Sequence, residues 1–223
     1  MNLLRLGAYS TLGAQSVEST GVLRMTQHEA GNGLSDQLLV ARCQADDLSA
    51  FDVLVDRYQV RVFGFARRMI GDAQEAEDVA QEVFVRAFRN IRRYDGRASV
   101  AGWLFTIATN LCIDRRRRSS RRVAEVPLEP DTDTKHRLVA RSGNPQEEAV
   151  AKQMQEAIHT ALGTLSDRLR PVLLLHDVEG MSYEEIANAL NIPVGTVKSR
   201  LFLARERLQS ALSAYLQAGD TDD

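Results

Sequence analysis

The stretch "SYEEIANALNIPVGTVKSRLFLARERL" (Ser182–Leu208) has the pattern of two helices separated by a short turn. Ser182 and Glu185 have the S-x-x-E spacing of a capping box, which satisfies free backbone N–H groups at the start of a helix. Pro193 interrupts the pattern, because proline lacks an N–H and disfavours a helical conformation in the residue before it. Since proline is tolerated in the first turn of a helix, a second helix can begin near Pro193 or the residue after it and run through Arg207. The stretch is therefore predicted to be a helix-turn-helix.

The second predicted helix has one apolar face and one mixed face. Its apolar side chains fall in a narrow arc, which is the face expected to be buried: Val197, Leu201, Ala204 and Leu208. The opposite face carries Gly195, Thr196, Ser199, Phe202, Leu203 and Glu206, flanked by Lys198 and Arg205 on one side and by Arg200 and Arg207 on the other. A helix that reads the major groove needs hydroxyls for base edges, an apolar atom for a thymine methyl group and cations for phosphates. The alternative is a core helix with solvated charges.

The composition is that of a soluble, largely helical protein without an evident active site. The 223 residues are 44% apolar, which is enough for packed cores, and the few prolines and glycines fall mostly between periodic segments. Cys43 and Cys112 have no second Cys or His at metal-ligand spacing, so we expect neither a disulfide framework nor a zinc site. Because no catalytic or phosphate-binding motif is present, we expect neither enzyme activity nor a cofactor.

No apolar run in the chain is long enough to cross a membrane, and the apolar run near the N-terminus is too short for a signal peptide. We therefore expect a cytoplasmic protein that does not insert into membranes. Residues 1–33 are expected to form a tail, and Met25 is an alternative start to Met1.

Residues 34–118 have the periodicity of a first helical domain. Its second helix is expected from about Ser49 and is closed by Gly71, and Asp72 opens the next helix. One face of that next helix carries Val79, Val83 and Ala87, whereas another is polar and acidic, with Asp78, Gln81, Glu82 and Val85. The acidic face suits either solvent or a basic partner.

The last helix of this domain is expected to be capped by Ser99. Its buried stripe is predicted to be Leu104, Ile107, Ala108 and Leu111, while Trp103, Thr106, Asn110 and Ile113 lie off that stripe. The helix ends in Arg115, Arg116, Arg117 and Arg118, with two more arginines within the next four residues.

Periodicity is lost after this helix and then returns. Residues 119–146 are rich in proline and polar residues, which predicts a flexible linker, and residues 147–215 form a second helical domain that ends in the helix-turn-helix. Residues 216–223 are left as a C-terminal tail. The predicted fold is all-α: two small helical domains on a linker.

The charges near the helix-turn-helix are polarised. Lys198, Arg200, Arg205 and Arg207 against Glu206 give +3, whereas Asp177, Glu179, Glu184 and Glu185 just upstream give −4. Affinity for a duplex grows with the number of phosphates neutralised, so weak binding to DNA is expected for the chain alone.

Three motifs in register, "AEDVAQEVFVRAF" (76–88), "WLFTIATNLCIDRRRR" (103–118) and the helix-turn-helix "SYEEIANALNIPVGTVKSRLFLARERL", resemble those of extracytoplasmic-function (ECF) sigma factors of bacterial RNA polymerase. The resemblance covers about residues 34–212. It implies that residues 34–118 are sigma region 2, which binds core RNA polymerase and opens the promoter at the minus-10 element. It implies equally that residues 147–215 are sigma region 4, which reads the duplex minus-35 element.

The resemblance also implies roles for individual residues. Asp78, Gln81 and Glu82 would dock on the clamp helices of the largest polymerase subunit. The single-stranded minus-10 element would meet Tyr94, Gly96, Arg97, Ala98, Ser99, Trp103, Asn110, Arg115, Arg116, Arg117 and Arg118, although Trp103 is equally compatible with a place in the core. The minus-35 element would meet Thr196, Lys198, Ser199, Arg200 and Phe202, while Leu203 departs from the family pattern, in which a basic residue is frequent.

Other classes of protein remain as alternatives. A polymerase-independent helix-turn-helix regulator would need a dimerisation surface, and no heptad repeat is present. A protein-interaction adaptor would leave the arginine run and the outward Phe202 unexplained. The family resemblance further implies an anti-sigma factor as partner, regulation in a stress or envelope response, and a monomer when free.

Overall fold

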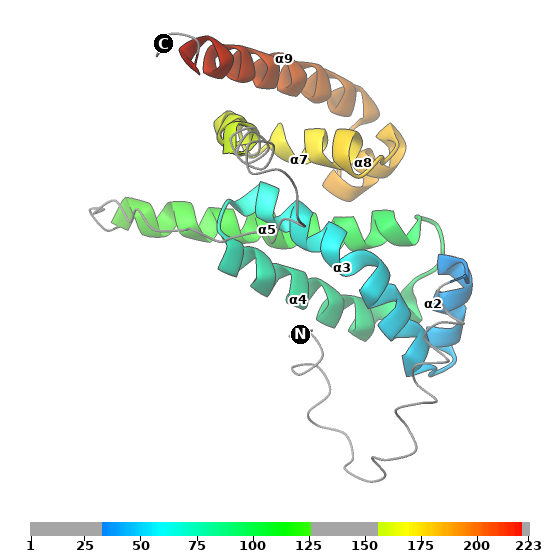
Figure 1. The fold of residues 1–223 in the computed structure, drawn as a ribbon. Coiled ribbons are helices and arrows are strands. Elements are labelled where there is room, and N and C mark those ends of the chain that lie inside the picture. The colour runs from blue at the N-terminus through cyan, green and yellow to red at the C-terminus, as the bar shows by residue number, and fades with distance from the viewer. Residues whose placement is uncertain (1–32, 126–155, 220–223) are drawn as a thin grey trace, which may run out of the picture.

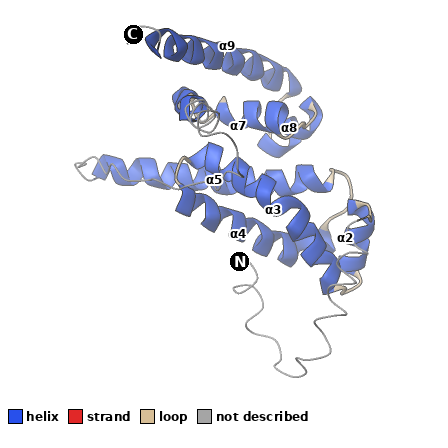
Figure 2. Cartoon of the chain, viewed as in Figure 1, coloured by secondary structure: helices blue, strands red, loops and turns tan. Residues whose placement is uncertain are grey.

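The computed structural model describes residues 33–125 and 156–219, and all regular secondary structure in those ranges is helical (Figures 1 and 2). The prediction of an all-α fold is therefore confirmed. The elements are α2 (Asp36–Gln44), α3 (Leu48–Ile70), α4 (Ala73–Asn90), a 3₁₀ turn (Ile91–Arg93), α5 (Val100–Glu125), α7 (Arg170–Leu173), a π-helical turn (Leu174–Val178), α8 (Tyr183–Leu190) and α9 (Val194–Gly219). Residues 156–164 are helical as well.

Helices α2 to α5 form an N-terminal helical unit whose helix ends follow from local sequence. The side chain of Asp47 accepts a hydrogen bond from the backbone N–H of Ser49, and that of Asp72 accepts one from Glu75, so both satisfy free donors at helix starts. Gly71 ends α3 with a φ of 96°, a conformation that side chains with a Cβ disfavour. The predicted boundary between these two helices is confirmed.

The core of the N-terminal helical unit lies where α3, α4 and α5 meet. The rings of Phe65 and Phe105, both fully buried, pack edge to face with centroids 5.4 Å apart. The predicted apolar face of α4, which carries Val79, Val83 and Ala87, is buried. On α5 the prediction is incomplete, because Phe105 and Cys112 are fully buried whereas Ile107 is only half-buried.

The helix-turn-helix has the predicted capping. The Ser182 hydroxyl accepts from the Glu185 backbone N–H, and a Glu185 carboxylate oxygen accepts from the Ser182 N–H at 3.0 Å. Asn191 turns the chain between α8 and α9 in the left-handed conformation, which asparagine tolerates better than most residues. Helix α9 begins at Val194, as predicted, and buries Val197, Leu201 and Ala204.

Two helices are longer than predicted. Helix α5 continues to Glu125 instead of ending near Arg118, so the first residues of the predicted linker are helical. Helix α9 runs on to Gly219, well beyond Arg207. The rest of the predicted linker and the first residues of the second domain lie outside the described residues.

Residues 156–219 form a C-terminal helical unit that packs on the N-terminal one through α5. Figure 1 shows α7 and α8 on one side of α5 and α4 on the other, with α9 furthest from α4. None of the described helices is long and apolar enough to span a bilayer.

Candidate nucleic-acid interface

The predicted polymerase-docking residues lie together on one exposed face of α4. Asp78 and Gln81 are exposed and Glu82 is half-buried. The Glu82 carboxylate accepts from the Nε of Arg86 at 2.7 Å, and an Asp78 oxygen lies 3.9 Å from an Arg115 guanidinium nitrogen. Both carboxylates of this face thus lie within ion-pair distance of arginines, one on α4 and one on α5.

Phe88 lies on the same side of α4, close in helical angle to Gln81. Its ring is 41% exposed and packs edge to face on Phe51, with centroids 5.1 Å apart. An exposed aromatic ring fixed by a buried one is a feature of contact surfaces. The sequence pattern placed Phe88 inside a motif but gave no sign of its exposure.

The predicted minus-10 loop is anchored at its start. The side-chain amide of Gln44 donates to the carbonyl oxygens of Ile91 and Tyr94, each at 2.9 Å. The Tyr94 hydroxyl donates to the Ala98 carbonyl, and burial raises the pKa of that hydroxyl. Gly96 has a φ of 74° at the turn. The loop is therefore held in one shape although most of its side chains are exposed.

A pocket lies beside this loop, between α4 and α5. Its lining combines predicted residues with others that sequence reasoning missed: Arg86, Asn90, Arg93, Tyr94, Trp103, Ile107 and Asn110. Two aromatic rings, an aliphatic side chain, amides and guanidinium groups converge there. This combination can stack an unpaired base and donate hydrogen bonds to its edge or its phosphate.

The helical spacing explains which residues meet in the pocket. Asn90 and Arg86 are one turn apart on α4, and Ile107 and Asn110 follow Trp103 at one-turn intervals on α5. The α4 residues and the α5 residues face each other only because the two helices pack together. The sequence of α5 therefore gave no sign that Arg86 and Asn90 of α4 would line the same pocket. Trp103, for which a place in the core was the alternative, is half-buried: it packs against the core and also lines the pocket.

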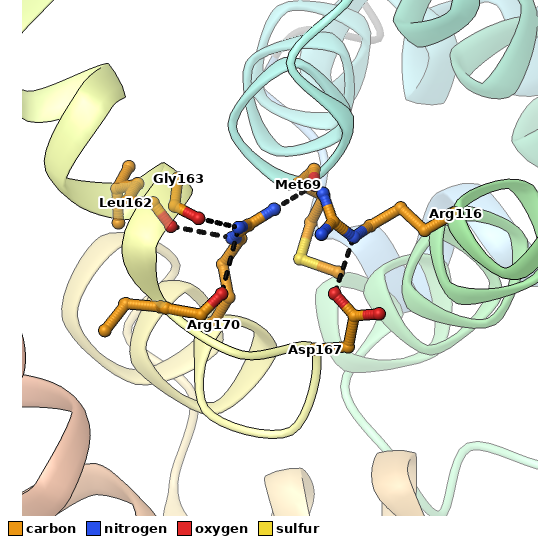
Figure 3. A network of polar contacts seen from close by, with 7 residues as sticks. Met69, Arg116, Leu162, Gly163, Asp167 and Arg170 are labelled. Carbon is orange, nitrogen blue, oxygen red and sulfur yellow. Dashed lines mark hydrogen bonds and ion pairs between the residues drawn. The ribbon is translucent and has the colours of Figure 1, made fainter. Parts of the chain in front are cut away.

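The four arginines of α5 do not form one surface, because successive residues on a helix point about 100° apart. Arg115 is directed to Asp78, while Arg117 and Arg118 are exposed. Arg116 is turned toward the C-terminal helical unit, where its Nε donates to Asp167 at 2.7 Å (Figure 3). The four side chains of the predicted phosphate-binding run thus do not share one face of α5.

On α9 the predicted minus-35 residues lie along the outer face. Lys198, Ser199 and Phe202 are exposed, Phe202 by 69%, whereas Thr196 and Arg200 are half-buried. The Lys198 ammonium lies 5.6 Å from the centroid of the Tyr183 ring on α8, a cation–π contact that orients it. An apolar ring this exposed, next to a cation and a hydroxyl, is suited to a groove of DNA.

Helix α9 is held to the preceding turn by an ion pair. Arg205 donates from Nε to Asp177 at 3.0 Å, and its second nitrogen also contacts this carboxylate. The hydrogen bond from Arg205 is the main reason why the pKa of Asp177 lies below its usual range, and a hydrogen bond from His176 acts in the same direction. The orientation of α9 is thereby coupled to a carboxylate outside the helix-turn-helix.

Among residues 33–125 and 156–219, no cluster of His, Cys, Asp and Glu side chains could hold a metal ion. Cys43 and Cys112 are both buried and unpaired.

Comparisons with known proteins agree with this arrangement. Residues 54–122 match the family description Sigma-70 region 2, and residues 155–208 match Sigma-70, region 4. The RNA polymerase sigma-H factor of Pseudomonas aeruginosa is 36% identical over 191 residues, which cover 82% of this chain and 96% of that protein. The ECF RNA polymerase sigma factor SigW of Bacillus subtilis is 36% identical over 176 residues, covering 78% of this chain and 94% of that protein.

A solved structure has a similar fold over most of the chain. It is that of the sigma factor RpoE in complex with the anti-sigma factor NepR from Bartonella quintana, at 26% identity and a TM-score of 0.59, with 73% of this chain and 96% of that chain covered. The two family matches, their order and the identity to full-length relatives lead to one assignment. The chain belongs to the ECF sigma factors of RNA polymerase.

Proposed function

We propose that this protein binds core RNA polymerase and directs it to a specific class of promoters. The observation that carries the proposal is the presence, in one chain and in the family's order, of three surfaces: the acidic face of α4, the pocket between α4 and α5, and the outer face of α9. None of the three supplies a catalytic constellation. The chain acts by selecting the site at which polymerase begins.

The charge distribution supports a division of labour with polymerase. Cations on the outer face of α9 are few, and Arg205 is already paired with Asp177. Since affinity for duplex DNA grows with the number of phosphates neutralised, the C-terminal helical unit alone binds weakly. Docking of Asp78, Gln81 and Glu82 on the polymerase clamp supplies the remaining affinity.

At the minus-10 element, the pocket takes one unstacked base of the non-template strand. Tyr94 and Trp103 provide the stacking surface and Asn110 the hydrogen bonds to the base edge. Arg86, Asn90 and Arg93 extend this site beyond the residues that the family resemblance indicated. Arg115, Arg117 and Arg118 contact flanking phosphates, which adds affinity that does not depend on sequence.

At the minus-35 element, α9 enters the major groove of the duplex. Lys198, Ser199 and Phe202 face the base edges, while Thr196 and Arg200 contact phosphates or neighbouring bases. Ser199 donates its hydroxyl proton to the Thr196 carbonyl at 3.1 Å, so its oxygen is presented outward as an acceptor. An adenine or cytosine amino group fits such an acceptor.

An anti-sigma factor is the proposed regulator. The related RpoE of Bartonella quintana was solved in complex with such a partner. We infer that this chain acts in the cytoplasm and is held inactive by a protein that covers its polymerase-binding or promoter-binding surfaces until a stress or envelope signal arrives.

Reconstituted transcription tests the proposal. Purified core polymerase and the chain are combined on a genomic library of promoter fragments, and transcript 5′ ends are mapped. We expect transcripts from a defined subset of fragments that are absent with core polymerase alone. A chain that fails to bind core polymerase, or that binds operators tightly as a dimer without it, would instead be a conventional helix-turn-helix regulator.

A further inference from the structure

A π-helical turn, Leu174–Val178, connects α7 to the loop before α8. The Glu179 N–H closes the turn by donating to the Leu174 carbonyl, five residues earlier, at 3.0 Å. The Leu174 side chain is buried, whereas His176 is half-buried and Asp177 is exposed. Single π-helical turns are frequent at functional sites. None of the roles proposed above uses His176.

His176 lies against both helices of the helix-turn-helix. Its ring stacks on the ring of Tyr183, the first residue of α8, with centroids 5.0 Å apart and planes inclined by 19°. Its Nδ1 lies 2.8 Å from an Asp177 carboxylate oxygen and 3.3 Å from a guanidinium nitrogen of Arg205 on α9. One side chain of the turn therefore has neighbours on α8 and on α9.

The Tyr183 ring in turn supports Lys198, one of the residues proposed to face the bases. The Lys198 ammonium lies 5.6 Å from the centroid of this ring. A lysine carries its compact charge on a flexible four-carbon stem, so an aromatic ring that attracts the charge restricts where it lies. Because Tyr183 is itself only half-buried, the stacked ring of His176 adds to the contacts that hold it in place.

Arg205 is held on the same side of α9 as Lys198. The two residues are seven positions apart, which is about two helical turns, so their side chains leave α9 in nearly the same direction. Arg205 pairs with Asp177, the chain neighbour of His176. The π-helical turn therefore holds both cations, Arg205 directly and Lys198 through Tyr183.

We propose that His176 is a positioning residue for recognition of the minus-35 element. It holds the Tyr183 ring, and this ring places the Lys198 ammonium on the outer face of α9. The inference rests on the assignment of Lys198 to the minus-35 element made above. It gives the π-helical turn a role in promoter selection although the turn lies outside the helix-turn-helix. His176 acts through Lys198 and needs no contact with DNA.

Three substitutions separate the stacking of His176 from its hydrogen bond. His176→Ala removes both interactions. His176→Asn keeps an amide that can donate to Asp177 but has no ring, whereas His176→Phe keeps a ring for Tyr183 but has no hydrogen-bonding group. Because the ring is the group proposed to act on Lys198, only the phenylalanine variant should resemble the wild type.

The position of the Lys198 side chain is measured first in the free, full-length chain. Protons near the face of an aromatic ring resonate upfield, and the ε-methylene group of Lys198 lies beside Tyr183. Because the chain has only three lysines, carbon-13 labelling of lysine gives a spectrum that is simple to assign. We expect the upfield shift to decrease in His176→Ala and His176→Asn and to persist in His176→Phe. Tyr183→Leu gives the spectrum without the ring.

Promoter recognition is then measured with core polymerase and the same variants, on a promoter that the wild type selects in the reconstituted assay described above. A cation–π contact at an exposed site corresponds to about a two- to fivefold change in an equilibrium constant. We therefore expect His176→Ala and His176→Asn to lower the affinity of the polymerase complex for this promoter about two- to fivefold. His176→Phe should restore it, and a promoter without a minus-35 element should show no loss.

A double-mutant cycle with Lys198→Ala separates positioning from a general loss of stability. If His176 acts through the lysine, His176→Ala has no further effect on promoter affinity once the lysine is absent. A structural defect would instead add the same loss in both backgrounds. His159→Ala, at an exposed histidine of the same helical unit, is the control, and thermal unfolding is compared for all variants.

Either of two results would overturn the positioning role: equal losses of promoter affinity in His176→Ala and His176→Phe, or an unchanged Lys198 resonance in His176→Ala. Failure of the proposed function is a different result. In that case the wild-type chain would give no polymerase-dependent transcripts, while the resonance measurements on the free chain would still show whether His176 places Lys198.

Discussion

The rings of Tyr94 and Trp103 lie 5.0 Å apart, centroid to centroid, with their planes inclined by 45°. One ring comes from the loop that follows α4 and the other from the first turn of α5, so their contact exists only in the packed unit. Both line the pocket proposed for the unstacked promoter base. Because Trp103 is the single tryptophan of the chain, its fluorescence reports on this pocket alone.

Removal of the Tyr94 ring should impair promoter opening. Stacking of one base on an aromatic side chain contributes about 1–3 kcal/mol, so Tyr94→Ala is expected to reduce the open-complex equilibrium about 5- to 150-fold. Tyr94→Phe keeps the ring and loses only the hydroxyl that donates to Ala98, and is the matched control. Permanganate reactivity of unpaired thymines measures opening, and equal loss in both variants would assign the effect to the loop's shape.

Charge reversal on α4 should weaken the complex with polymerase. Asp78→Arg and Glu82→Arg each place a cation on the face proposed to dock on the clamp, and like charges at an interface oppose binding, so affinity should fall about tenfold or more. Glu184→Arg changes the charge equally at an exposed position of α8 and serves as control. Fluorescence anisotropy of labelled chain with core polymerase gives the dissociation constants; unchanged values would place the docking surface elsewhere.

Truncation on the outer face of α9 should reduce initiation without loss of stability. Lys198→Ala and Phe202→Ala are expected to cost about 1–3 kcal/mol each in promoter selection, as loss of one base contact does. Since Phe202 is 69% exposed, its truncation should leave the unfolding free energy nearly unchanged. Transcription is measured from promoters with and without a minus-35 element, and only the promoters with this element should lose activity. Gln209→Ala, two turns beyond Phe202 on α9, is the control variant.

The Asp177–Arg205 pair should make the packing of α9 sensitive to acid. The pKa of Asp177 is lower in the folded chain than in the unfolded one, so its stabilising contribution is present above about pH 4 and is lost as the pH falls through the folded pKa. The difference in unfolding free energy between the wild type and Asp177→Asn is expected to be largest near neutral pH and to shrink below about pH 4. Urea titrations across this range measure it; a difference that grew on acidification would contradict the assignment.

Truncation of Phe105 should destabilise the N-terminal helical unit. The ring is fully buried against Phe65, and removal of a buried aromatic side chain costs about 3–5 kcal/mol. Phe105→Leu keeps part of the volume and should cost less. Denaturant unfolding followed by circular dichroism gives both values, and a loss below about 1 kcal/mol for Phe105→Ala would mean that the site is not tightly packed.

Local signals were sufficient for the helix starts and ends. Ser182, Asp72 and Gly71 have the predicted roles because capping depends on residues within one turn of each other. Assignment of single residues to the polymerase and promoter surfaces rests on the family resemblance and stays a prediction.

Contacts between helices were not accessible from the pattern. A narrow apolar stripe was predicted for α5, but this helix packs against α3, α4 and α8, so its buried arc is wider and includes Phe105. Arg86 and Asn90 line the pocket only because α4 faces α5. Arg116 was predicted as one of four phosphate contacts, and its pairing with Asp167 depends on how the two helical units pack.

The Met69 carbonyl receives hydrogen bonds from both Arg116 and Arg170. Because this oxygen belongs to the main chain, an exchange of the amino acid at position 69 alters the thioether but leaves the acceptor in place. Substitutions at the two arginines therefore remove this junction between the helical units directly, whereas substitutions at the methionine reach it only through the packing of its side chain.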